Sequence, residues 1–258
     1  MSVRKKTVTL NREEIHLKKA GLAFCTVSLV FLAMGCASSG NAILLADRTP
    51  IALVAMVSNG YINWQDEPID PRQPAGFLSE RNLRRDPDLT LIARADELIN
   101  TAESMFRDAM AASPLINLAE RDTVLFSGAY QNAQLRRTQV SGDMVKPSDF
   151  RFVNSQDKAF FSALAGEAGI QRCMFVEFVF SKKMTGGLGK NGNFRAELTM
   201  KVSVFDAQGK SIFRNSYALW SDSTIRASGG LYSESGVMEL FESALGDVYR
   251  EFLFELNM

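Results

Sequence analysis

Histidine is almost absent from this chain of 258 residues, in which His16 is the only one. Ser-His-Asp and Cys-His catalytic sites need an imidazole base, and many zinc sites need imidazole ligands. His16 lies in a charged amino-terminal segment, far from any expected pocket. The sequence therefore excludes histidine-dependent catalysis and histidine-ligated zinc.

An excess of charge of one sign is also missing, because 29 Lys and Arg residues balance 29 Asp and Glu residues. A protein built to bind nucleic acid usually carries a basic excess, so we expect no nucleic-acid partner. Hydrophobic residues make up 46% of the chain and charged residues 22%. These proportions are typical of a globular protein and argue against a disordered chain, a collagen-like repeat or a polytopic membrane protein.

Cysteine is scarce, and the three in the chain are Cys25, Cys36 and Cys173. The first two lie in the amino-terminal region. Cys173 opens an apolar run that ends at Val176, where a single cysteine is expected to be a small core residue rather than a nucleophile. We expect no disulfide within the chain.

The amino-terminal region lacks an apolar run long enough for a standard membrane span. The uncharged run from Gly21 to Met34 has about 14 residues, below the ~20 that a spanning helix needs. Six basic residues precede it and small residues follow it, from Gly35 to Gly40. This arrangement is typical of a secretory signal. An uncleaved anchor over residues 20–37 and an unlipidated secreted protein are the alternatives.

Leu32-Ala33-Met34-Gly35-Cys36 resembles the lipobox of bacterial lipoproteins. The resemblance implies that residues 1–35 are a signal peptide, that Cys36 becomes the lipidated first residue, and that residues 36–49 are a tether. Two or more acyl chains hold a protein stably on a membrane. Ala37 stands where an Asp would resemble an inner-membrane retention signal, so the outer membrane is favoured over the inner. We therefore expect a cell-envelope protein.

Removal of residues 1–35 would change the charge of the protein. The remaining 223 residues would carry 23 Lys and Arg against 27 Asp and Glu, a formal net charge of −4. Such a body has no overall attraction to nucleic acid or to anionic lipid head groups.

The hydrophobic pattern predicts one α+β domain over residues 50–258. A doubly buried strand is expected at 51–57, a long loop at 58–88, a helix capped by Asp88 at 89–112, a strand at 123–130 and a helix at 157–168. Three strands follow at 172–181, 194–205 and 210–221, with a turn at 206–209, and a last helix capped by Ser233 or Ser235 runs to 256. In strand 194–205 the alternation places Arg195, Glu197, Thr199, Lys201 and Ser203 on one face and apolar residues on the other.

The resulting order is β-α-β-α-β-β-β-α, with helices packed on a mixed sheet that contains a long antiparallel hairpin. Over residues 50–256 this order resembles the amino-terminal domain of TolB and the related domains of the CsgG and LpoB envelope lipoproteins. The resemblance implies a domain that is anchored in the envelope and binds other proteins.

The loop at 58–88 is the candidate interaction segment, because aromatic residues and arginines are common anchors of protein interfaces. Its candidate residues are Tyr61, Trp64, Arg72, Phe77, Arg84 and Arg85. The alternative is that the aromatic side chains fold back onto the domain.

Other motifs give weaker indications of a site. Gly187-Leu-Gly189-Lys-Asn-Gly192 matches a dinucleotide-binding pattern by letter, but a strand is expected after it, so a hairpin loop is favoured. Lys182, Lys183, Lys190 and Arg195 make this loop basic, which suits an acidic partner or lipid head groups, although a solvated loop is the simpler interpretation. Glu177 is expected to face solvent or to pair with Lys or Arg.

Taken together, the sequence predicts a non-enzymatic, lipid-anchored envelope protein without a cofactor, which binds another envelope component as an accessory or assembly factor. Two alternatives stay open. One is a solute-binding lipoprotein. The other is a hydrolase that works without histidine, through carboxylates such as Asp66, Glu67 and Asp70 or through the Ser155-x-x-Lys158 pair. The partner and the oligomeric state are left open.

Overall fold

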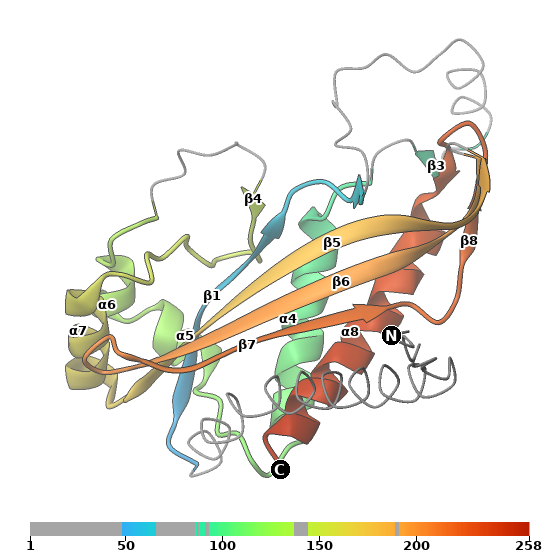
Figure 1. Ribbon diagram of the computed structural model, residues 1–258. Helices are drawn as coiled ribbons and strands as arrows, with labels where there is room; N and C mark the ends of the chain where they lie inside the picture. Colours follow the sequence, from blue (N-terminus) through green and yellow to red (C-terminus); the bar gives the residue numbers. More distant parts are fainter. Residues whose placement is uncertain are drawn as a thin grey trace, which may run out of the picture. The chain divides into compact units, whose positions relative to one another are not determined.

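The computed structural model describes residues 48–65, 86, 88–90, 93–136, 144–188 and 191–257. Its main feature is a seven-stranded mixed sheet (Figure 1). The strands are β1 (Ile51–Asn59), β2 (Asn63–Trp64), β4 (Met144–Val145), β5 (Arg172–Leu188), β6 (Asn191–Asp206), β7 (Ser211–Trp220) and β8 (Ile225–Ala227). The helices are α4 (Asp96–Ala111), α5 (Arg121–Leu125), α6 (Gly128–Gln131), α7 (Lys158–Ala168) and α8 (Glu234–Glu255). This mixture confirms the predicted α+β class.

The sheet runs in the order β4-β1-β5-β6-β7, in which β1 is parallel to β5, and β6 is antiparallel to both of its neighbours, β5 and β7. β1 is buried from Ile51 to Ser58, which confirms the strand expected to be covered on both faces. At the end of β1 the side-chain amide of Asn59 makes the two hydrogen bonds to β5 that the backbone of a further strand residue would make. The amide donates to the carbonyl of Phe180 at 2.9 Å and accepts from the N–H of Phe180 at 2.8 Å.

β5 and β6 form one long hairpin, paired from Arg172 opposite Asp206 to Leu188 opposite Asn191. Near its tip Gly187 and Gly192 face each other with φ of 127° and 149°. A Cβ on Gly187 would lie 2.0 Å from the carbonyl oxygen of Asn191, so the glycines are needed for close backbone approach. The glycine motif therefore belongs to a hairpin, as expected, and not to a dinucleotide site.

Helices α4 and α8 cover one face of the sheet (Figure 1). The ring of Phe252 on α8 packs against Phe106 of α4 and against Phe213 and Tyr217 of β7. Ser233, one of the two caps that the sequence offered, caps α8 through its hydroxyl, which accepts from the N–H of Gly236. No described helix is long and apolar enough to cross a membrane.

The helix predicted at 89–112 begins later, at Asp96. Residues Leu89–Thr90 form β3 instead, which pairs with β9 (Tyr232–Ser233). Asp88 does not cap the helix that follows it. Its carboxylate accepts hydrogen bonds from the hydroxyl of Ser233 and from the backbone N–H of Ser235, and these contacts lower the pKa of Asp88. Asp88 therefore supports the start of α8, a partner far away in the sequence.

The strand predicted at 123–130 is wrong, because this segment forms α5 and α6. Ser127 caps α6, and the carboxylate of Glu167 on α7 accepts from the N–H groups of Gly128 and Ala129 at 2.6 and 2.7 Å. These two acceptors satisfy donors that a helix start leaves free. The helical state of this apolar segment thus depends on a residue about 40 positions later, which local pattern does not reveal.

Helix α7 covers one end of the other face of the sheet. The ring of Phe161 stacks on Phe205 and meets Phe175 edge to face. Asp157 caps α7 and Gly169 ends it in the left-handed conformation, so the helix expected at 157–168 is confirmed. Beyond this end, the strands β5, β6 and β7 are left uncovered by the described helices.

Candidate functional site

We call the uncovered surface of β5, β6 and β7, opposite α4 and α8, the open face. Its side chains come from alternate positions: Glu177, Val179, Ser181 and Lys183 of β5, Arg195, Glu197, Thr199, Lys201 and Ser203 of β6, and Arg214, Ser216, Ala218 and Trp220 of β7. The five β6 residues are those that the alternation assigned to one face, and that prediction is confirmed. The inward residues of β6, such as Met200 and Val202, are fully buried.

A groove of about 720 Å³ hollows the open face where it meets the segment before α7. Ala55 and Val57 of β1 form its floor together with Phe175 and Val176, and Arg136 and Asn154 lie on its wall. The groove is lined by polar groups above an apolar floor. Such a surface suits a polar or charged ligand that lies across it.

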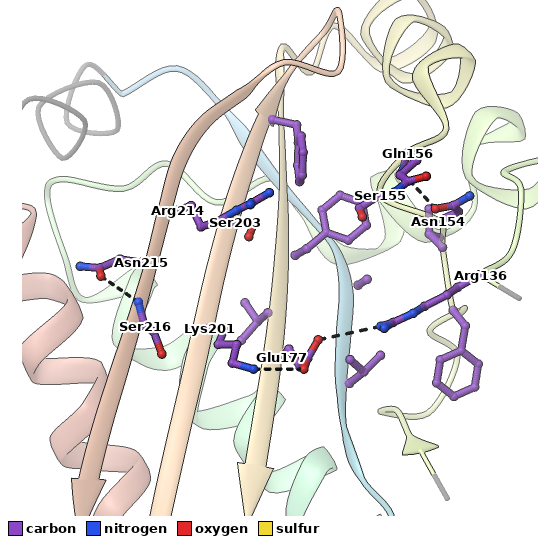
Figure 2. Close-up of a pocket in the computed structure, with 17 residues that line it drawn as sticks. Arg136, Asn154, Ser155, Gln156, Glu177, Lys201, Ser203, Arg214, Asn215 and Ser216 are labelled. Carbon is purple, nitrogen blue, oxygen red and sulfur yellow. Dashed lines mark hydrogen bonds and ion pairs between the residues drawn. The ribbon is translucent and has the colours of Figure 1, made fainter. Parts of the chain in front are cut away.

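Four charged residues form what we call the groove cluster: Arg136, Glu177, Lys201 and Arg214. The carboxylate of Glu177 lies between Lys201 and Arg136, with N···O distances of 3.7 and 3.9 Å (Figure 2). Both pairs are loose and half exposed, so each contributes little to stability. The pairing of Glu177 agrees with the sequence prediction.

The groove cluster carries three positive charges against one negative charge. Arg214 is exposed, and within the described part of the chain it forms no ion pair. Glu177 cannot neutralise three cations, so the groove presents a net positive potential in a chain that has no overall excess. A carboxylate or phosphate group is the ligand chemistry that this potential favours.

A second group, which we call the tryptophan cluster, lies farther along the same face and consists of Lys183, Arg195, Glu197 and Trp220. The indole of Trp220 is 42% exposed, and the guanidinium of Arg195 stacks on it at 3.3 Å from the ring centroid. The amine of Lys183 lies 5.0 Å from the same ring. The indole N–H donates to Glu197 at 3.1 Å, which fixes the ring in place.

The tryptophan cluster also leaves a cation unsatisfied. The Nε atom of Arg195 is buried and has no hydrogen-bond partner among the described residues. Glu197 is engaged by Trp220 and by the hydroxyl of Ser181. An exposed, oriented tryptophan flanked by arginine is the kind of residue that anchors protein interfaces.

The predicted interaction residues of the 58–88 loop fall into two groups. Trp64 is buried, packs edge to face against Phe194 and Tyr232, and so belongs to the core. Tyr61 is half-buried and lies against the guanidinium of Arg94. For Trp64 the structure therefore supports the alternative that the aromatic residue folds back onto the domain. Arg72, Phe77, Arg84 and Arg85 lie outside the described residues, as does Cys36.

A buried lysine beside Trp64 escaped the sequence analysis. Lys182 was expected to be part of a basic loop, but its side chain is fully buried. Its amine donates to the carbonyl of Ile62 and lies 2.6 Å from the hydroxyl of Tyr232. Burial lowers the pKa of Lys182 to about 7. The amine also lies over the rings of Trp64 and Tyr232, which partly compensates the cost of a buried cation.

The structure also places the residues considered for catalysis. Cys173 is buried, and burial raises the pKa of its thiol to about 12, which suits a core residue rather than a nucleophile. Ser155 lines the groove, and Lys158 is the first residue of α7. Asp66, Glu67 and Asp70 lie outside the described residues. Within the described ranges, no three His, Cys, Asp or Glu residues are grouped to hold a metal ion.

Comparisons with known proteins give only distant likenesses. No family model and no curated protein matches the chain. The fold is similar to the carboxy-terminal domain of LpoB from Salmonella enterica, with 11% identity and a TM-score of 0.32 over 71% of this chain and 95% of that one. It is also similar to the hypothetical protein CT253 from Chlamydia trachomatis, with 10% identity and a TM-score of 0.32 over 81% of this chain and 94% of that one. Likenesses of this size do not decide the function.

Proposed function

We propose that this protein is a lipid-anchored component of the bacterial cell envelope that binds another envelope protein through its open face. In this proposal it acts as an accessory or assembly factor and catalyses no reaction. The observation that carries the binding role is the open face itself, where two positively charged clusters lie on a sheet surface that no described helix covers.

The two faces of the sheet differ in role: one face forms the core, and the other is available for binding. Apart from Phe205, which packs against Phe161 of α7, the apolar residues of β6 lie in the core on the side of α4 and α8. The open face contributes little to that core beyond its α7 end, so its charges and its exposed Trp220 need another explanation than folding. Binding of a partner supplies one, because exposed aromatic and arginine side chains are enriched at interfaces.

The anchoring part of the proposal rests on the sequence around Cys36. The charged start, the short apolar run and Gly35-Cys36 together favour cleavage before Cys36 and lipidation of its thiol. The residue after Cys36 is Ala37, which favours the outer membrane. Residues 36–49 would then tether the folded part to the membrane.

The anchor is tested by mass spectrometry of the mature amino terminus together with membrane fractionation. We expect an acylated cysteine at position 36 and loss of the protein from the detergent phase in a Cys36→Ala variant. Cys25→Ala is the matched control, because it removes a cysteine from the apolar run without touching the lipobox. A native product that keeps its initiator methionine, or a free thiol at Cys36, would contradict the anchor.

The binding role is tested by chemical crosslinking in intact cells, with the captured proteins identified by mass spectrometry. The wild type is compared with a variant that carries Lys201→Glu and Arg214→Glu. We expect an envelope protein that is captured by the wild type and lost in the variant. Equal capture by both chains would remove the open face from the proposal, and a co-purified small acidic solute in the groove would favour a solute-binding lipoprotein instead.

A further inference from the structure

The two clusters on the open face are aligned along one strand. Lys201 of the groove cluster and Arg195 of the tryptophan cluster both lie on β6, six positions apart. At ~3.3 Å per residue this places them about 20 Å apart along the strand. Each cluster holds more cations than acids, so the open face has two positive centres at a fixed separation.

Between Lys201 and Arg195 the face carries one charged side chain, that of Glu197, whose carboxylate is already engaged by Ser181 and Trp220. Val179, Thr199 and Ala218 form one row across β5, β6 and β7, and Ser181 and Ser216 flank it. Small side chains of this kind leave room for a chain to lie close to the sheet. The hydroxyls of Thr199 and Ser216 can bond main-chain groups of an extended segment, whereas a helix satisfies those groups internally.

From this arrangement we propose that the open face binds an extended acidic segment of another envelope protein, with one group of carboxylates at Lys201 and Arg214 and a second at Lys183 and Arg195. This inference rests on the proposed function and adds the chemistry of the partner. Trp220, on the edge strand β7, contacts the part of the segment that lies between its two groups of carboxylates. Glu197 is engaged by Trp220 and Ser181, so the carboxylates of the segment supply a counter-charge for the guanidinium of Arg195.

A protein segment fits this surface better than a membrane does. Glu177 and Glu197 lie inside the two clusters, and their carboxylates would repel the anionic head groups of a bilayer surface. A segment with acids at only two points can place uncharged residues over Glu177 and Glu197. The wide spacing of the cations selects a pattern of acids, whereas a lipid surface presents anionic charge everywhere.

The test uses the full chain purified in detergent and a dye-labelled peptide that holds two Glu-Glu pairs. The pairs lie about six residues apart in an extended chain, as the clusters require at ~3.3 Å per residue. Fluorescence anisotropy of the dye reports binding. We expect saturable binding that weakens as salt is added, because exposed charges are screened. A peptide in which Gln replaces every Glu is the matched ligand control.

Variants assign the binding to the open face. Lys201→Glu together with Arg214→Glu should weaken binding at least about tenfold, because like charges then meet across the interface. Arg250→Glu is the matched control, since Arg250 is 80% exposed on α8 and should leave affinity unchanged. The emission of Trp220 should change on binding, and Trp220→Phe should remove that change while anisotropy still reports the peptide.

Three results would overturn the inference. They are equal affinity for the Glu and Gln peptides, an unchanged affinity in the doubly reversed variant, and binding of the Cys36→Ala chain to phosphatidylglycerol vesicles through Lys201 and Arg214. If the peptide fails but the wild type still captures an envelope protein by crosslinking, the acidic class of partner is wrong and the proposed function stands. If both fail, the proposed function is wrong as well.

Discussion

The two faces of the sheet are built from alternate residues of the same strands, but they have different surroundings. On one face, residues such as Met200 and Phe213 are covered by α4 and α8 and have almost no exposed surface. On the open face, Lys201 and Trp220 reach solvent, and the nearest ion pairs are loose. The covered face therefore supplies the stability of the fold, which leaves the open face free to be selected for binding. Unequal effects of substitutions on the two faces test this view.

The largest effect on stability is expected on the covered face. Phe252→Ala removes a fully buried ring that packs against Phe106, Phe213 and Tyr217, and should lower the free energy of unfolding by about 3–5 kcal/mol. Val179→Ala on the open face, where Val179 is 38% exposed, should cost less than about 1 kcal/mol. Urea unfolding followed by circular dichroism measures both. Equal losses of unfolding free energy in the two variants would contradict the view that the covered face supplies the stability.

A pH-dependent effect is expected at Lys182, which lies on the covered side of β5. The folded protein holds this amine with a pKa of about 7, while the unfolded chain keeps the ordinary value of 10.5. Above pH 7 unfolding therefore takes up a proton, so raising the pH stabilises the fold by up to about 1.4 kcal/mol per pH unit. The gain ends near pH 10.5, and below pH 7 this contribution is flat.

Urea unfolding at several pH values from about 7 to 9 gives the slope, the change in the free energy of unfolding per pH unit. The range ends at the ordinary pKa of 9.0 for the Cys173 thiol, because this buried thiol adds a pH dependence of its own above that value. Lys182→Met keeps the length of the side chain and should abolish the slope. Lys183→Met is the neighbouring control on the open face and should keep it. A wild type without a slope would show that the amine stays protonated in the folded protein.

A smaller loss of stability is expected at the contact between α7 and α6, beside the open face. Glu167→Gln leaves one acceptor for the N–H groups of Gly128 and Ala129 instead of a carboxylate, and should cost about 1 kcal/mol. Glu242→Gln on the exposed side of α8 is the matched control. Hydrogen exchange at residues 128–131 should rise only in the first variant. If both variants exchange alike, α6 does not depend on this contact.

The smallest effect on stability is expected at the centre of the groove cluster. Glu177→Gln removes loose, half-exposed ion pairs and should change the free energy of unfolding by no more than about 0.5 kcal/mol. The same substitution removes a repelling carboxylate and should tighten binding of the acidic peptide. Paired unfolding and anisotropy measurements check both effects. A large loss of stability would mean that the open face also holds the fold together.

Much of this architecture was predictable from local sequence pattern. The alternation in residues 194–205 predicts which side chains of β6 reach the open face, and the two candidate caps, Ser233 and Ser235, predict the start of α8 to within two residues. The segment at 123–130 could not be assigned in this way, because Glu167 stabilises its helices from α7. The start of α4 was also missed, since Asp88 binds the start of α8 instead.

The candidate site could be predicted only in part. The β6 residues of the two clusters were placed on one face, and Glu177 was expected to pair. Their partners come from other segments. The register of β6 and β7 brings Arg214 and Trp220 to them, and a backbone hydrogen bond from Arg136 to Phe152 holds Arg136 beside the groove. The burial of Trp64 matches the alternative that the sequence left open, whereas the burial of Lys182 was not expected. Their burial depends on Phe194 and Tyr232, which lie far away in the sequence.

The central claim is that the open face, and not the helical face, binds a partner in the envelope. A photo-crosslinking amino acid placed at Ala218 on the open face, and separately at the exposed Glu242 on α8, tests it most directly in living cells. We predict a discrete crosslinked protein from position 218 and none from position 242. Crosslinks from position 242 alone, or the same product from both positions, would show that the open face is not the specific binding surface.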